Sequence, residues 1–162
     1  MDKESTTPPG LAAKIGAGLI VLWSVLHIWV GGDGLAKFFA GDVKAQWQGF
    51  LGGSKASMEA FVHTTDAVTA NVHAHMIVNF CVDVGGYGVL GLVAAWLIWR
   101  QASWLGYFMF VVLVGICDLA FTFSLVTSGI ITLNAGTVGG PVLWVLACVI
   151  TPFGLARPGV SR

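Results

Sequence analysis

Four apolar runs, separated by polar segments, dominate the pattern of side chains along the chain. They cover residues 11–30, 77–99, 104–126 and 141–156. A helix that crosses the hydrocarbon core of a bilayer needs roughly 17–25 residues, and each run is about that long. Backbone polar groups in lipid must be satisfied within their own segment, so long apolar runs in a membrane form helices. We therefore predict an all-α protein, a bundle of four transmembrane helices.

The longest polar segment, residues 31–70, holds a weaker helical pattern. Its apolar residues recur mostly at steps of three and four, and they are Leu35, Phe38, Phe39, Val43, Trp47, Phe50 and Leu51. This spacing predicts a short amphipathic helical segment in the membrane interface, interrupted at Gly41 and Asp42. The second and third runs are joined by residues 100–103 alone. A connection this short makes the two helices antiparallel neighbours.

Composition agrees with a membrane protein and excludes several alternatives. The chain has 162 residues, of which 56% are hydrophobic and 10% are charged, whereas a soluble domain has about 25% charged residues. The net charge is zero, so there is no electrostatic basis for binding nucleic acid. Cys81, Cys117 and Cys148 all lie in apolar runs, which argues against an extracellular disulfide framework. The partner that composition predicts is the lipid bilayer.

Basic residues indicate the orientation of the bundle. Those of the two tails and of the short linker are Lys3, Lys14, Arg100, Arg157 and Arg162, while residues 127–140 contain none. Lys and Arg accumulate in cytoplasmic segments, a rule that weakens for a loop as long as residues 31–70. We predict an integral protein of the cytoplasmic (inner) membrane with both termini in the cytoplasm. A single domain, 11–156, lies between a disordered tail, 1–10, and a short tail, 157–162.

Three ionisable residues lie inside apolar runs at similar predicted depths. From the cytoplasmic end of each run, Asp83 lies roughly 25 Å, Asp118 roughly 22 Å and His27 roughly 20–24 Å along the helix. Such a residue costs about 2.5–3.5 kcal/mol at a helix centre, so it should face the bundle interior and a partner. We predict that Asp83 and Asp118 face each other and His27 in one polar pocket. Asn79 and Tyr87, one turn on either side of Asp83, extend it.

The predicted pocket is compatible with several kinds of ligand. A metal ion, a haem or a lipophilic small molecule such as a quinone would each give it a redox-linked or proton-linked role. A haem would need His27 together with His73 or His75 as axial ligands, although the latter two lie roughly 37–40 Å from the cytoplasmic end. Alternatively, the two aspartates accept hydrogen bonds from Trp, Tyr, Ser or Thr donors and only fix the register of the helices.

A second candidate site precedes the second apolar run. His63, Asp66 and His73 lie on one side of a helix if the helix extends that far, a pattern that could hold Zn²⁺ or Cu²⁺. His75 could join His73 on one metal ion only if the segment is unwound, since side chains two residues apart do not share a helical face. Solvated histidines in the membrane interface are the alternative interpretation.

Two further functions stay open at this stage, as does the question whether the protein is an enzyme. The chain has 22 glycines and no G-x-S-x-G, H-E-x-x-H or C-x-x-C motif. These features agree with a non-catalytic accessory subunit of a larger membrane complex or with self-association. Intramembrane carboxylates are also typical of proton relays, so a proton-coupled transporter that acts as an oligomer is a further hypothesis.

Overall fold

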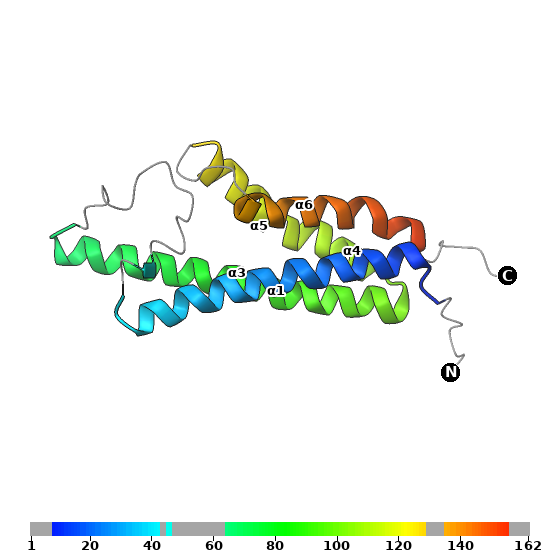
Figure 1. The fold of residues 1–162 in the computed structure, drawn as a ribbon, viewed down its shortest axis with the longest axis horizontal. Coiled ribbons are helices and arrows are strands. Elements are labelled where there is room, and N and C mark those ends of the chain that lie inside the picture. Colours follow the sequence, from blue (N-terminus) through cyan, green and yellow to red (C-terminus); the bar gives the residue numbers. More distant parts are fainter. Residues whose placement is uncertain (1–7, 43–44, 47–63, 129–134, 156–162) are drawn as a thin grey trace.

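The computed structural model describes residues 8–42, 45–46, 64–128 and 135–155, and the regular elements of this part are all helical (Figure 1). Within it, four helices are long and apolar enough to cross a membrane. They are Leu11–Phe39, Ala67–Gln101, Trp104–Val126 and Gly136–Gly154. The predicted class, an all-α bundle of four transmembrane helices, is confirmed. The chain is a small polytopic membrane protein.

The first helix, α1, spans Leu11–Phe39 and is longer than the predicted span of 11–30. Residues 31–39, which the sequence assigned to a separate interfacial segment, continue α1 without a break. The helix ends where the interruption was predicted, because Gly41 has a φ of 72°, a conformation that L residues rarely adopt. The later apolar residues of the predicted segment, Val43, Trp47, Phe50 and Leu51, lie outside the described residues.

The second helix, α3, spans Ala67–Gln101 and starts well before the predicted residue 77. Asp66 is its N-cap. One carboxylate oxygen of Asp66 accepts hydrogen bonds from the backbone N–H of Thr69 at 2.8 Å and from its hydroxyl at 2.6 Å. The first bond satisfies a donor that the first helical turn otherwise leaves unpaired. The helix therefore begins in polar sequence, ahead of the apolar run.

Capping by Asp66 predicts a pH effect confined to the first turn of α3. The hydrogen bonds from Thr69 lower the pKa of Asp66 below its ordinary 3.8. Because the folded pKa is depressed, the stabilisation is present above pH 3.8 and is lost as pH falls through the lower folded value. We expect Asp66→Ala at neutral pH to speed amide hydrogen exchange in this turn relative to intrinsic rates, whereas Asp66→Asn, an equally good cap, should retain protection. Unchanged exchange in Asp66→Ala would contradict the capping role.

The third span occupies the predicted range, 104–126, but it is not a uniform α-helix. Its parts are α4 (Trp104–Phe108), η2 (Met109–Val114), α5 (Gly115–Phe121) and η3 (Thr122–Val126). The η2 and η3 parts are π-helical, with i→i+5 hydrogen bonds that place more residues in each turn than an α-helix does. The same number of residues therefore rises less far, and the side chains that follow η2 are rotated. Asp118 lies between the two π segments.

The fourth span combines α6 (Ala135–Ile150) with the 3₁₀ turn η4 (Thr151–Gly154). The sequence predicted Pro141 as the first helical residue, but the helix begins earlier and Pro141 lies inside it. A proline in a helix lacks one hydrogen-bond donor, yet transmembrane helices tolerate it because neighbouring groups provide partners. The additional turns bring Gly139 and Gly140 into the bundle.

The helices α1 and α3 run side by side, and small residues let them approach closely (Figure 1). A Cβ atom on Gly88 would lie 2.7 Å from Cγ1 of Ile28. The fourth span packs along α1, and the backbone N–H of Gly10 donates to the carbonyl oxygen of Gly154 at 2.9 Å. The two ends of the described chain therefore meet at one end of the bundle, which also contains Arg100. We call it the Arg100 end.

The third span packs on α3 at the Arg100 end and then diverges. Its first two parts, α4 and η2, contact α3. Figure 1 shows α5 leaning away from α3 towards the opposite end of the bundle. On its other side, α5 packs against α6 at Gly115, where a Cβ atom would lie 2.6 Å from the indole ring of Trp144. Two cavities border α5.

Candidate functional site

Asp118 of α5 is buried, and two residues of α1 hold its carboxylate. One oxygen, Oδ2, accepts a hydrogen bond from the indole Nε1 of Trp23 at 2.6 Å. The other oxygen, Oδ1, lies 3.5 Å from Nε2 of His27. Trp23 has 0% exposed surface, so its N–H group depends on this carboxylate for a partner. We refer to Trp23, His27 and Asp118 as the Trp-Asp-His cluster.

The spacing of Trp23 and His27 on α1 explains why both contact the Asp118 carboxylate. They are four residues apart on α1 and therefore share one face of the helix. Their rings stack with centroids 3.5 Å apart and an interplanar angle of 18°. Phe110 of η2 meets the Trp23 ring edge-on at 5.7 Å. These contacts hold both rings in place against the third span.

The hydrogen on His27 can be assigned from its partners. Nδ1 lies 2.8 Å from the backbone carbonyl oxygen of Trp23, and a carbonyl oxygen only accepts, so Nδ1 carries a hydrogen. Nε2 faces Oδ1 of Asp118. Two bare acceptors would repel each other, so a hydrogen bond here needs one hydrogen, on either the imidazole or the carboxyl group. Nε2 and Oδ1 are thus two neighbouring atoms, 3.5 Å apart, that can each carry a hydrogen.

The Trp-Asp-His cluster borders a cavity of about 390 Å³, the His27 cavity, lined by residues of α1, α3, α5 and α6. Gly140 of α6 closes the wall beside the cluster. A Cβ atom on Gly140 would lie 3.0 Å from Cε1 of His27 and 3.1 Å from Oδ1 of Asp118. Most of the remaining lining is apolar, including Leu26, Val30 and other such residues. A mainly apolar cavity with a few convergent polar groups is typical of a site for a small molecule.

Asp83 belongs to a second cavity, which corrects the single pocket predicted from the sequence. Its side chain is exposed and accepts a hydrogen bond from Nδ2 of Asn79 at 2.9 Å. Together with Tyr87, it lines a cavity of about 590 Å³ between α3 and the α5–η3 part of the third span, the Asp83 cavity. The two cavities share lining residues, among them Phe80 and Cys117. The predicted site residues are therefore divided between neighbouring cavities.

The two aspartates also differ in their level along the bundle. Gly88 of α3 packs against Ser24 and Ile28 of α1, which places it level with the Trp-Asp-His cluster. Asp83 lies more than one turn further along α3, roughly 7 Å by helical rise. The similar depths predicted from the sequence assumed uniform α-helices. Because the π-helical η2, which precedes Asp118, rises less per residue than an α-helix, the predicted depth of Asp118 was too large.

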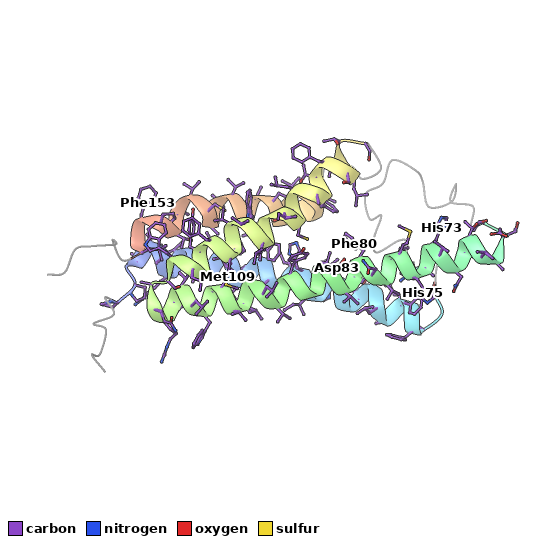
Figure 2. The ribbon with its side chains drawn as sticks, turned by 180° about the vertical axis from the view of Figure 1, so that it is seen from behind. His73, His75, Phe80, Asp83, Met109 and Phe153 are labelled. Carbon is purple, nitrogen blue, oxygen red and sulfur yellow. The ribbon has the colours of Figure 1, made fainter. Side chains whose placement is uncertain are left out.

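The predicted metal ligands near the start of α3 do not converge. Asp66 caps the helix, His73 lines the Asp83 cavity and His75 meets the ring of Phe38 at 5.6 Å. Figure 2 shows His73 and His75 on opposite sides of a continuous helix, so the unwinding that would bring them together is absent there. His63 lies outside the described residues. In the described part of the chain, no three His, Cys, Asp or Glu side chains are grouped to hold a metal ion.

The arrangement of the histidines also opposes the bis-histidine haem. His75 packs beside Phe38, and Phe38 lies roughly 16 Å from His27 along α1. The two axial ligands of a haem bind one iron atom from opposite sides. His73 lines the Asp83 cavity and not the His27 cavity. Haem ligation by these pairs would require a different arrangement of the helices.

Sequence reasoning did not assign Trp23, Gly139 and Gly140 to the site. The signal for Trp23 was available, because a tryptophan one turn before His27 in an apolar run places a hydrogen-bond donor on the same face. The two glycines were assigned to a loop, since the fourth helix was expected to begin at Pro141. The sequence analysis also allowed an alternative in which an aspartate accepts a hydrogen bond from a Trp donor. Trp23 and Asp118 form such a bond.

The fold and the site together define a class: a small polytopic membrane protein of four helices, with a buried Trp-Asp-His cluster beside a cavity. No protein family, curated protein or solved structure matches this chain.

Proposed function

We propose that the protein binds a lipophilic small molecule in the His27 cavity, with the polar head group of the ligand hydrogen-bonded to His27. The hydrogen bonding of the His27 ring is the observation that carries this proposal. Nδ1 is committed to the carbonyl oxygen of Trp23, whereas Nε2 has only a long contact of 3.5 Å with Asp118. Hydrogen bonds of this kind usually measure roughly 2.7–3.2 Å. Nε2 therefore retains the capacity for a second partner.

We propose a proton-linked role for this site as well, because Nε2 of His27 and Oδ1 of Asp118 can each carry a hydrogen. When Nε2 of His27 carries a hydrogen it can donate to a carbonyl oxygen of the ligand, and when it is bare it can accept from a hydroxyl group. The N–H of Trp23 supports Asp118 in either state, because it can donate to a carboxylate or to the carbonyl oxygen of a carboxylic acid. Ring compounds with carbonyl or hydroxyl groups, such as quinones and phenols, match this chemistry.

The rest of the His27 cavity suits an apolar ligand. A volume of about 390 Å³ lies within the roughly 300–1,000 Å³ typical of small-molecule sites. Leu26 and Trp29 line the cavity and are also 44% and 67% exposed on the surface of the protein, so part of its wall reaches the lipid. A metal ion finds less support, because His27 and Asp118 are two close ligands and Zn²⁺ is usually held by three or four.

The distribution of basic residues supports a location in the cytoplasmic membrane with both termini in the cytoplasm. The meeting of Gly10 and Gly154 at the Arg100 end agrees with an even number of spans. Lys14 lies at this end, with its Nζ atom 5.9 Å from the centroid of the Trp99 ring. Basic and aromatic residues are both enriched where a helix leaves the membrane.

Binding of a short-chain ubiquinone analogue to the protein in lipid nanodiscs tests the proposal through two neighbouring glycines. Gly140→Ala places a methyl group 3.0 Å from Cε1 of His27 and 3.1 Å from Oδ1 of Asp118, whereas a methyl group on Gly139 meets nothing within 4 Å. Since both glycines line the cavity, Gly139→Ala controls for the added volume. We expect Gly140→Ala to raise the Kd about tenfold, a loss of about 1.4 kcal/mol, and Gly139→Ala to change it far less.

The donor itself is tested by His27→Phe, which keeps a ring that can stack on Trp23. We expect weaker binding by about 0.5–1.5 kcal/mol, the usual contribution of one hydrogen bond. Empty nanodiscs measure partitioning of the analogue into lipid. No retention above that background by the wild type, or equal retention by His27→Phe, would remove the basis of the proposal.

A further inference from the structure

We infer that the Asp83 cavity is a second binding site, whose ligand is a lipophilic organic cation such as a tertiary amine or a quaternary ammonium ion. The cavity has a volume of about 590 Å³ and lies between α3 and the α5–η3 part of the third span. Its lining combines the carboxyl group of Asp83 with the rings of Phe80, Tyr87 and Phe121. This inference does not depend on the ligand proposed for the His27 cavity.

The charge of Asp83 is the first argument. Along α3, Asp83 lies roughly 25 Å from Arg100, and hence within a hydrocarbon core about 30 Å thick. Its hydrogen-bond partner is the neutral amide of Asn79. His73, which lines the same cavity, is roughly 15 Å away along the helix. A carboxylate at this depth is stabilised by a nearby positive charge, which a bound cation would supply.

The aromatic rings are the second argument. Phe80 and Tyr87 lie three residues before and four residues after Asp83, so the three side chains share one face of α3. Figure 2 shows Phe80 and Asp83 on the side of α3 that faces the third span, from which Phe121 completes the lining. The faces of aromatic rings attract cations, and groups of such rings recognise quaternary ammonium ions. A neutral ligand could pack against the rings, but it would leave the negative charge of Asp83 without a positive charge beside it.

The position of the cavity allows a lipophilic ligand to enter from the bilayer. The third span diverges from α3 here, as Figure 1 shows. Met76 of α3 and Ile116 of α5 line the cavity from its two sides and are 67% and 53% exposed on the surface. A cation with an apolar body concentrates in the membrane interface and can reach Asp83 without crossing the packed contact between α1 and α3.

Benzyltrimethylammonium and its neutral carbon isostere, neopentylbenzene, form a pair of probes that differ in charge and not in shape. We expect the wild type in nanodiscs to bind the cation, as measured by isothermal titration calorimetry, and the isosteric variant Asp83→Asn to bind it about tenfold more weakly or worse. The neutral isostere should bind weakly and equally to both proteins. Asp33→Asn is the matched control. It removes a carboxylate of α1 that is paired with Lys37, and we expect it to leave binding unchanged.

A measurement on the wild type keeps the test independent of how the variants fold. Dicyclohexylcarbodiimide modifies carboxylic acids within a membrane, and peptide mapping locates the adduct. We expect benzyltrimethylammonium to protect Asp83 and to leave the modification of Asp118 unchanged. Equal binding of the cation by wild type and Asp83→Asn, or equal protection by the neutral isostere, overturns the inference. Protection that rises with protein concentration and not with the cation also overturns it, because it assigns the cavity to a second copy of the chain.

Discussion

Asp118→Leu is expected to destabilise the bundle far more than Asp83→Leu does. The substitution at Asp118 removes the acceptor of the fully buried Trp23 N–H, and an orphaned buried donor costs about 1–3 kcal/mol. It also removes the partner of His27 Nε2. Asp83 is exposed and bonded to an amide of its own helix, so its replacement by leucine should be neutral or stabilising in lipid.

Unfolding of the two variants by increasing fractions of sodium dodecyl sulfate in mixed micelles measures this difference. Asp118→Asn is the intermediate variant, because its amide oxygen can still accept the hydrogen bond from Trp23. We expect the order of stability to be wild type, Asp118→Asn and then Asp118→Leu. Equal losses for Asp118→Leu and Asp83→Leu would mean that the Trp-Asp-His cluster does not hold the third span to α1.

Gly31→Ala is expected to be the most damaging conservative change in the contact between α1 and α3. A Cβ atom there would clash with the backbone carbonyl oxygen of Cys81 and lie 2.9 Å from the backbone nitrogen of Gly85. Backbone atoms cannot rotate away as a side chain can, so the helices must separate. Overpacking of this kind typically costs about 1–3 kcal/mol.

Gly32→Ala is the matched control for this prediction, since a Cβ atom on Gly32 meets nothing within 4 Å. An exposed glycine-to-alanine change in a helix is neutral or favourable by up to about 1 kcal/mol. A second pair of substitutions tests the same helix contact nearer the Arg100 end. A Cβ atom on Gly88 would lie 2.7 Å from Cγ1 of Ile28, whereas a Cβ atom on Gly86 would have nothing within 4 Å. Equal free energies of unfolding within each pair would contradict the close approach of α1 and α3.

The fold was predictable because the thickness of a bilayer sets the length of an apolar helix. The ends of the helices were not, because hydrogen bonds outside the apolar runs determine them. Asp66 starts α3 in polar sequence through its bond to Thr69, and α1 continues to Phe39, shortly before Gly41 turns the backbone. Apolar periodicity contains no information about either feature. The early start of α6 before Pro141 was also missed.

Part of the candidate site was also predictable, since His27 and Asp118 are ionisable residues in apolar runs and the structure brings them into contact. The placement of Asp83 in the same pocket was not supported. Counting residues at the rise of an α-helix cannot anticipate the π-helical η2, whose i→i+5 bonds change both the level and the direction of Asp118. Small errors in level and rotation decide which cavity a side chain lines.

Nitrogen-15 NMR of histidine-labelled protein in nanodiscs tests the central claim most directly, namely that His27 presents Nε2 to a ligand in the His27 cavity. The His27 signals are identified by their loss in His27→Phe. We predict a protonated Nδ1 with and without ligand, as its bond to the Trp23 carbonyl requires, and an Nε2 signal that shifts as a short-chain ubiquinone analogue is added. An Nε2 signal of His27 that stays unchanged at saturating analogue, while other histidines respond, would contradict the account.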